Sequence, residues 1–138
     1  MSSFRLGIAA LCFSLANGGI VAAEDAKEAK FTPGTYYTRI SESEIADPSL
    51  RVNAGLWQAV FRADGSYRVY RDRALVGEGG YSTKGGRIAI ADNAVVCRGL
   101  GNGTYSFVSD GKTLQLTLVT DRCSHRRLVL TIHTWKKQ

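Results

Sequence analysis

The chain has 138 residues and a formal net charge of +6 at neutral pH. This length supports one domain with one modest hydrophobic core and excludes an architecture of several large domains. The positive charge is sufficient for solubility alone, and it also suits an acidic partner.

Residues 1–23 have the pattern of a secretory signal peptide. Arg5 precedes an uncharged apolar run, and small residues at 21–23 form a cleavage site before Glu24. Polar residues at 17–19 interrupt the run, so it is marginal for crossing a bilayer, which takes about 20 apolar residues. We therefore expect a periplasmic or secreted protein, with no transmembrane segment in the mature chain.

Residues 24–33 are mostly polar and are expected to form a flexible leader, and residues 34–138 the folded domain. Eight segments of this domain alternate in polarity and are rich in aromatic and β-branched residues, which predicts strands. The predicted strands are 34–40, 56–62, 66–72, 75–82, 87–92, 103–109, 113–120 and 127–135.

One segment, 41–55, is predicted to contain a short helix. Ser41 stands three residues before Glu44, which is the spacing of a capping box, and Pro48 is expected to stop the helix. No alternation of strands with long helices is present. The fold class predicted is therefore all-β.

The alternation makes one face of each strand apolar and the other polar, as in an antiparallel sheet. Eight such strands in a small domain must close on themselves or form two layers. In simple up-and-down order, the long connections 41–54, 93–102 and 121–126 lie at one end. We therefore predict a single eight-stranded antiparallel up-and-down barrel with one short helical segment.

Cys97 and Cys123 lie on two of these long connections, so they can meet at that end. In an oxidising compartment such a pair is usually a disulfide. The alternative is a zinc site that adds Asp121 and His125, but the paired C-x-x-C spacing is missing. We predict the disulfide and no metal.

Three short motifs resemble those of the lipocalins and related calycin barrels. Gly55-Leu56-Trp57 looks like the family's G-x-W, and Thr120-Asp121 looks like its T-D. Arg126 or Arg127 resembles the arginine that packs over the tryptophan. The resemblance implies a barrel whose end with these motifs is closed, here by 41–54, and open at the opposite end. A strand before G-x-W and the short chain depart from the family's pattern.

Small eight-stranded barrels are either filled by side chains or hold one small ligand. Both states stay open for this chain. The candidate residues for lining a ligand site are the aromatic side chains Tyr36, Trp57, Phe61, Tyr81, Tyr105 and Phe107.

A second group of residues makes the long-connection end basic. The group consists of Arg71, Arg73, Arg98, Arg122, Arg126 and Arg127. Arginine mixed with aromatic residues can bind nucleic acid, but an exported protein rarely meets that partner. The basic end therefore predicts an anionic envelope component or an acidic protein as the partner.

No catalytic motif stands out, and no cofactor-binding motif is present. His125 with Asp121, Glu78 between two glycines, and Asp92 are the residues that catalysis could use. Each also has a plainer explanation, such as Asp92 balancing an arginine. We expect no catalytic site, so an enzyme ranks behind the two other functions.

The leading expectation is an exported protein that holds a small apolar or aromatic molecule in a lipocalin-like barrel. The alternative is a secreted or envelope interaction protein, such as an inhibitor, that has a filled barrel and uses its basic loops. Neither expectation includes a cofactor.

Overall fold

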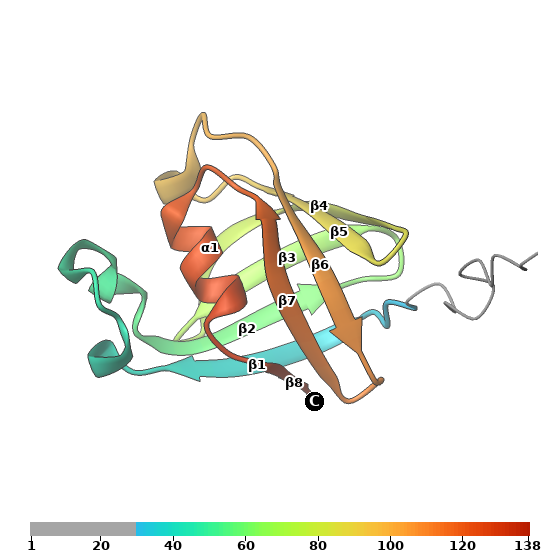
Figure 1. Cartoon of the computed structure of the whole chain (residues 1–138), viewed down its shortest axis with the longest axis horizontal. Helices are drawn as coiled ribbons and strands as arrows, with labels where there is room; N and C mark the ends of the chain where they lie inside the picture. The colour runs from blue at the N-terminus through green and yellow to red at the C-terminus, as the bar shows by residue number, and fades with distance from the viewer. Residues whose placement is uncertain (1–29) are drawn as a thin grey trace, which may run out of the picture.

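In the computed structural model, which describes residues 30–138, eight strands close into one antiparallel barrel (Figure 1). Strands that follow one another in the chain pair with one another, and the last pairs with the first. The strands are β1 (Gly34–Ile40), β2 (Gly55–Phe61), β3 (Ser66–Arg71), β4 (Ala74–Lys84), β5 (Arg87–Asp92), β6 (Gly103–Ser109), β7 (Thr113–Thr120) and β8 (Trp135–Lys137). The predicted up-and-down barrel is confirmed.

Alternating polarity explains the strands. On β2, Trp57, Ala59 and Phe61 are buried, whereas the residues between them are partly exposed. The strands predicted between 34 and 120 are all present, and β4 extends beyond its predicted limits of 75–82. The short β8 closes the barrel by pairing with Tyr36 and Tyr37 of β1 and with Thr113 and Leu114 of β7.

The strand predicted over 127–135 is wrong. Residues Ser124–Thr131 form the helix α1, and only the short β8 follows it. The physical reason is the spacing of the buried residues, which fits one face of a helix. These residues are Arg126, Val129 and Leu130.

The predicted helical segment 41–55 forms two short 3-10 helices, η1 (Glu42–Glu44) and η2 (Pro48–Asn53). The Ser41 N–H donates to Glu44 Oε2 at 2.8 Å, as the capping-box spacing predicted. Pro48 begins η2 and does not stop a helix, because a first helical position needs no N–H donor. A third 3-10 helix, η3 (Val95–Cys97), lies between β5 and β6.

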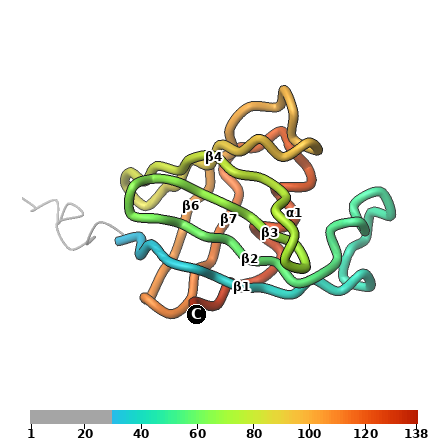
Figure 2. Tube along the Cα trace, turned by 180° about the vertical axis from the view of Figure 1, so that it is seen from behind, coloured from blue at the N-terminus to red at the C-terminus, as the bar shows by residue number. Residues whose placement is uncertain are grey.

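The connections divide the barrel into two ends, because each strand reverses the direction of the last. We call the end with connections 41–54, 93–102 and 121–134 the loop end. The opposite end, with the tight turns between β2 and β3, β4 and β5, and β6 and β7, is the turn end. Figures 1 and 2 show α1 and the long connections gathered at the loop end, away from the hairpins.

The turn half of the barrel is filled by aromatic side chains. Phe31, within the predicted leader, packs against Phe61, Tyr81 and Phe107 with ring centroids 5.1, 5.3 and 5.5 Å away. Phe61 also contacts Tyr67 at 5.0 Å. The residues just before β1 therefore cover the turn end.

Cys97 and Cys123 form the predicted disulfide, with their sulfur atoms 2.01 Å apart. It joins η3 to the start of α1 at the loop end. Within residues 30–138, α1 and the 3-10 helices are all too short to cross a membrane. The predicted signal peptide, 1–23, lies outside the described residues.

Candidate functional site

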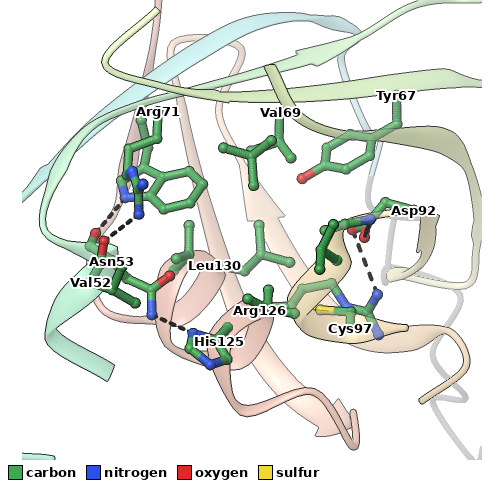
Figure 3. A pocket seen from close by; sticks show the side chains of 16 residues that line it. Val52, Asn53, Tyr67, Val69, Arg71, Asp92, Cys97, His125, Arg126 and Leu130 are labelled. Atoms are coloured by element: carbon green, nitrogen blue, oxygen red, sulfur yellow. Dashed lines mark hydrogen bonds and ion pairs between the residues drawn. The ribbon is translucent and has the colours of Figure 1, made fainter. Parts of the chain in front are cut away.

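A cavity of about 290 Å³ opens at the loop end, between α1, η2, η3 and the inner faces of β2 and β3 (Figure 3). Its wall is mainly apolar. The apolar side chains that form it include Trp57, Val69, Val76, Ala94, Val129 and Leu130. The lipocalin resemblance implied an opening at the turn end, whereas this cavity opens at the loop end and Phe31 with its aromatic neighbours packs at the turn end.

α1 builds one side of the cavity. Its inward face carries Arg126, Val129 and Leu130, which all line the cavity. The disulfide holds this helix against η3, whose residue Cys97 also lines the cavity. The two cysteines are 26 residues apart in the sequence. On the chain-entropy model, a disulfide that closes a loop of this length stabilises the fold by about 3.5 kcal/mol.

A buried ion cluster lies at the inner side of the cavity. Arg126 Nε donates to Asp121 Oδ2 at 2.6 Å, and Nη2 donates to Asp121 Oδ1 at 2.7 Å. Arg126 Nη2 also donates to the Gly101 carbonyl at 2.8 Å. Arg126 Nη1 lies 3.6 Å from Asp92 Oδ2. Such two-point pairing makes a strong, directional contact.

The rest of the cluster surrounds Asp121. The Tyr105 hydroxyl donates to Asp121 Oδ2, and the Cys123 N–H donates to Oδ1 at 2.9 Å. Gly103 leaves the room for this carboxylate, because a Cβ at that position would overlap Asp121 Oδ2. The cluster therefore joins β6, the end of β7 and the first turn of α1.

The pKa values in the cluster favour charged Asp121 and charged Arg126. Burial alone would raise the pKa of Asp121, but hydrogen bonds from Arg126, Tyr105 and Cys123 outweigh it and lower that pKa. Burial alone would lower the pKa of Arg126, but Asp121 and the charge of Asp92 raise it. Burial and the contact with Asp121 raise the pKa of Tyr105, so its hydroxyl stays protonated.

Trp57 forms a flat part of the wall. Its Nε1 donates to the Asn53 carbonyl at 2.7 Å, which ties β2 to η2. The guanidinium carbon of Arg71 lies 5.9 Å from the centroid of the Trp57 ring. The arginine over this tryptophan is therefore Arg71, and the role expected of Arg126 or Arg127 was wrong because Arg126 pairs with Asp121.

His125 does not form the suggested dyad with Asp121. His125 Nδ1 accepts a hydrogen bond from Asn53 Nδ2 at 2.8 Å, so its proton is on Nε2 when the ring is neutral. Glu78 forms an ion pair with Arg68 at 3.2 Å on the outer surface, not in the cavity. Asp92 does balance an arginine, Arg126.

The aromatic residues predicted to line a ligand site lie in two places. Trp57 lines the cavity. Four others, Tyr36, Phe61, Tyr105 and Phe107, are buried in the barrel core. Tyr81 is partly buried, and its hydroxyl donates to the Arg62 carbonyl at the turn end.

The six predicted arginines of the loop end also differ in their surroundings. Arg126 is buried, and Arg71 is partly buried and donates to the Val52 carbonyl. The other four are exposed and remain accessible, namely Arg73, Arg98, Arg122 and Arg127.

Other lining residues were not predicted as part of a site. Val129 was assigned to a strand, and Asn53 to a helical segment without a role. Tyr67 and Val69 stand at alternate positions of the predicted strand 66–72, and this alternation is a signal that could have identified them as inward-facing. Among residues 30–138, no three His, Cys, Asp or Glu side chains are placed to hold a metal ion. Cys123 is used by the disulfide.

Neither protein-family models, curated proteins nor solved structures give a match to this chain. The eight-stranded antiparallel barrel is consistent with the lipocalin resemblance. Gly55-Leu56-Trp57 begins β2 and Thr120-Asp121 ends β7, both at the loop end. The fold is therefore assigned from the order and pairing of its strands.

Proposed function

We propose that this protein is exported and binds one small apolar or aromatic molecule in the cavity at the loop end. The observation that carries this proposal is the cavity of about 290 Å³ with its apolar wall. Small-molecule sites typically measure roughly 300–1,000 Å³ and are mostly apolar with a few polar groups. The volume suits a ligand of two or three rings.

The mouth of the cavity supports an apolar ligand. Val52, Val95 and Val96 line it and are 58%, 72% and 46% exposed. Exposed apolar groups around a hollow are typical of binding sites. A ligand that covers these side chains removes their surface from water, which favours binding.

The disulfide supports export, because disulfides persist in oxidising compartments such as the periplasm or the extracellular space. This agrees with the signal peptide predicted at 1–23. We therefore place the proposed ligand-binding protein in the periplasm or outside the cell.

The test is a titration with the uncharged dye N-phenyl-1-naphthylamine, followed by dye fluorescence and by quenching of the tryptophan fluorescence, to which Trp57 in the cavity wall contributes. Val76→Phe narrows the cavity and should weaken binding by roughly tenfold, which is about 1.4 kcal/mol. Val108→Phe is the matched control, because Val108 lies on β6 and is 69% exposed outside the cavity. No change in fluorescence, or equal binding by both variants, contradicts the proposal.

A second candidate function is binding of an anionic envelope component or acidic protein by the exposed arginines of the loop end. Arg73, Arg98, Arg122 and Arg127 are exposed on the segments of the loop end, and within residues 30–138 none of them forms an ion pair with the buried cluster. Charge reversal at Arg98 and Arg122 should then abolish a salt-sensitive interaction with an anionic polymer such as heparin. Reversal at Arg62, exposed at the turn end, is the control.

A further inference from the structure

We propose, on the basis of the ligand-binding function above, that the ligand is uncharged and carries one group that both donates and accepts hydrogen bonds. A carboxamide is the simplest such group. It would bind beside Asp92, Arg126 and Tyr67 at the inner side of the cavity.

The first observation is an incomplete contact between Arg126 and Asp92. Arg126 Nη1 is buried and has no hydrogen-bond partner among residues 30–138. Asp92 Oδ2 is 3.6 Å away, which is longer than a hydrogen bond. Asp92 Oδ1 is used, because it accepts from the Ala94 N–H at 3.1 Å.

Both groups are deeply buried. The side chains of Arg126 and Asp92 are 4% and 3% exposed, and both residues line the cavity. A buried donor such as Arg126 Nη1 normally finds a partner, because leaving it unpaired costs free energy. A group with an acceptor and a donor side by side completes both contacts.

Tyr67 supplies the third polar group. Its ring is buried, and Figure 3 shows its hydroxyl directed into the cavity without a contact to the other side chains drawn. Burial and the charge of Asp92 raise the pKa of Tyr67, so the hydroxyl is protonated at neutral pH. It can therefore donate to a ligand oxygen.

The charges at this side of the cavity disfavour an anionic ligand. Asp121 and Asp92 carry two carboxylates, and Arg126 is their common cation. The positive charge of Arg126 is already balanced by the negative charge of Asp121, which accepts two of its hydrogen bonds. A ligand carboxylate would therefore lie close to the negative charge of Asp92, in surroundings where charges are weakly screened.

The opposite wall suits the rest of the ligand. Trp57 presents a flat ring, and Val69 and Leu130 also line the cavity. Arg71 lies at the Trp57 side of the cavity and is engaged by the Val52 carbonyl. A planar ring system can pack here while its polar group reaches Asp92.

The test compares three probes with one skeleton, namely naphthamide, methylnaphthalene and naphthoate substituted at the same ring position. Binding is measured by calorimetry and by competition with N-phenyl-1-naphthylamine. Naphthamide should bind roughly tenfold more tightly than methylnaphthalene, the effect of about one well-made hydrogen bond. Naphthoate should bind most weakly.

Two variants assign the effect to residues. Tyr67→Phe should weaken naphthamide by roughly threefold to tenfold and leave methylnaphthalene unchanged. Asp92→Asn keeps an oxygen for the Ala94 N–H but removes the charge, so it should shift the preference towards naphthoate. Tyr70→Phe is the control, because Tyr70 lies on β3 but does not line the cavity.

The outcomes separate the two proposals. Equal affinities for the three probes would overturn the inference about the polar group and leave ligand binding standing. If naphthoate binds most tightly, the inference of an uncharged ligand is overturned, and an anionic ligand that pairs with Arg71 takes its place. Failure of all three probes and of the dye would overturn both. If Asp92→Asn does not fold, the wild-type series and Tyr67→Phe still decide.

Discussion

Arg126 holds together three segments that are distant in the sequence. Its guanidinium contacts Asp121 after β7, the Gly101 carbonyl before β6, and Asp92 at the end of β5. The side chain arises from α1, so these contacts also fix the position of the helix. A single buried arginine thus sets the shape of the cavity's inner side.

Replacing Arg126 by methionine should destabilise the fold by about 3–5 kcal/mol, because two carboxylates lose their buried cation. Urea unfolding followed by circular dichroism measures this loss. Arg127→Met, one residue further and exposed, should change the free energy of unfolding by less than about 0.5 kcal/mol. A similar small effect of both changes would show that the cluster contributes little.

The stability should also fall in acid because of Asp121. Its pKa in the folded state is lowered, so its contribution is complete above the unfolded value of about 3.9. As the pH falls below that value, the unfolded chain takes up the proton first and the contribution is lost. The measurement is the free energy of unfolding between neutral pH and pH 2.

The control for this pH dependence is Asp121→Asn, which should be less stable at neutral pH but lose less on acidification. Exposed carboxylates such as Asp110 and Asp64 also have lowered pKa values because they accept hydrogen bonds in turns. They remain in the variant and account for the slope that is left. An unchanged slope in Asp121→Asn would contradict the role of Asp121.

At the scale of the element, α1 is the segment whose secondary structure could not be predicted from the local sequence pattern. The segment contains Leu128, Leu130 and Ile132 at alternate positions and several β-branched residues, which favours a strand. The same segment has Arg126, Val129 and Leu130 at helical spacing. The choice depends on Asp121 and Asp92, which make it favourable to bury the arginine. Asp92 comes from the end of β5, far away in the sequence, so the local pattern alone could not reveal this contact.

The candidate site could be predicted only in part for the same reason. The inward positions of Trp57 and Tyr67 follow from alternation along β2 and β3. The cavity itself exists because α1 and η3 cross the loop end and leave space beneath them. An error in one element therefore hid the lining contributed by Val129. The aromatic core of the turn half needs no such element, and its strand residues could be predicted from alternation, but Phe31 could not because it was assigned to the leader.

The disulfide should matter most for the two elements that it joins. Replacing both Cys97 and Cys123 by serine should reduce stability by about 3.5 kcal/mol, because the open chain gains conformational freedom. Amide hydrogen exchange should increase in 93–102 and in the first turn of α1, with little change in β2 and β3. Exchange that increases evenly over the barrel would contradict this local role.

At the scale of the whole molecule, the barrel has two halves with different tasks. The turn half is a packed aromatic core, in which Phe61 contacts Phe31, Tyr67 and Tyr81. The loop half contains the cavity. Eight-stranded barrels are just wide enough for either arrangement. Combining them lets one half supply stability while the other keeps space for a ligand.

This division predicts that Phe31 affects stability and not binding. Phe31→Ala removes a partly buried ring from four aromatic contacts and should cost about 2 kcal/mol in the free energy of unfolding. Lys30→Ala, at the exposed neighbouring position, is the control and should have almost no effect. The affinity for naphthamide, measured where both variants are folded, should equal that of the wild type. Weaker binding by Phe31→Ala alone would mean that the two ends of the barrel are coupled through β2 and β3.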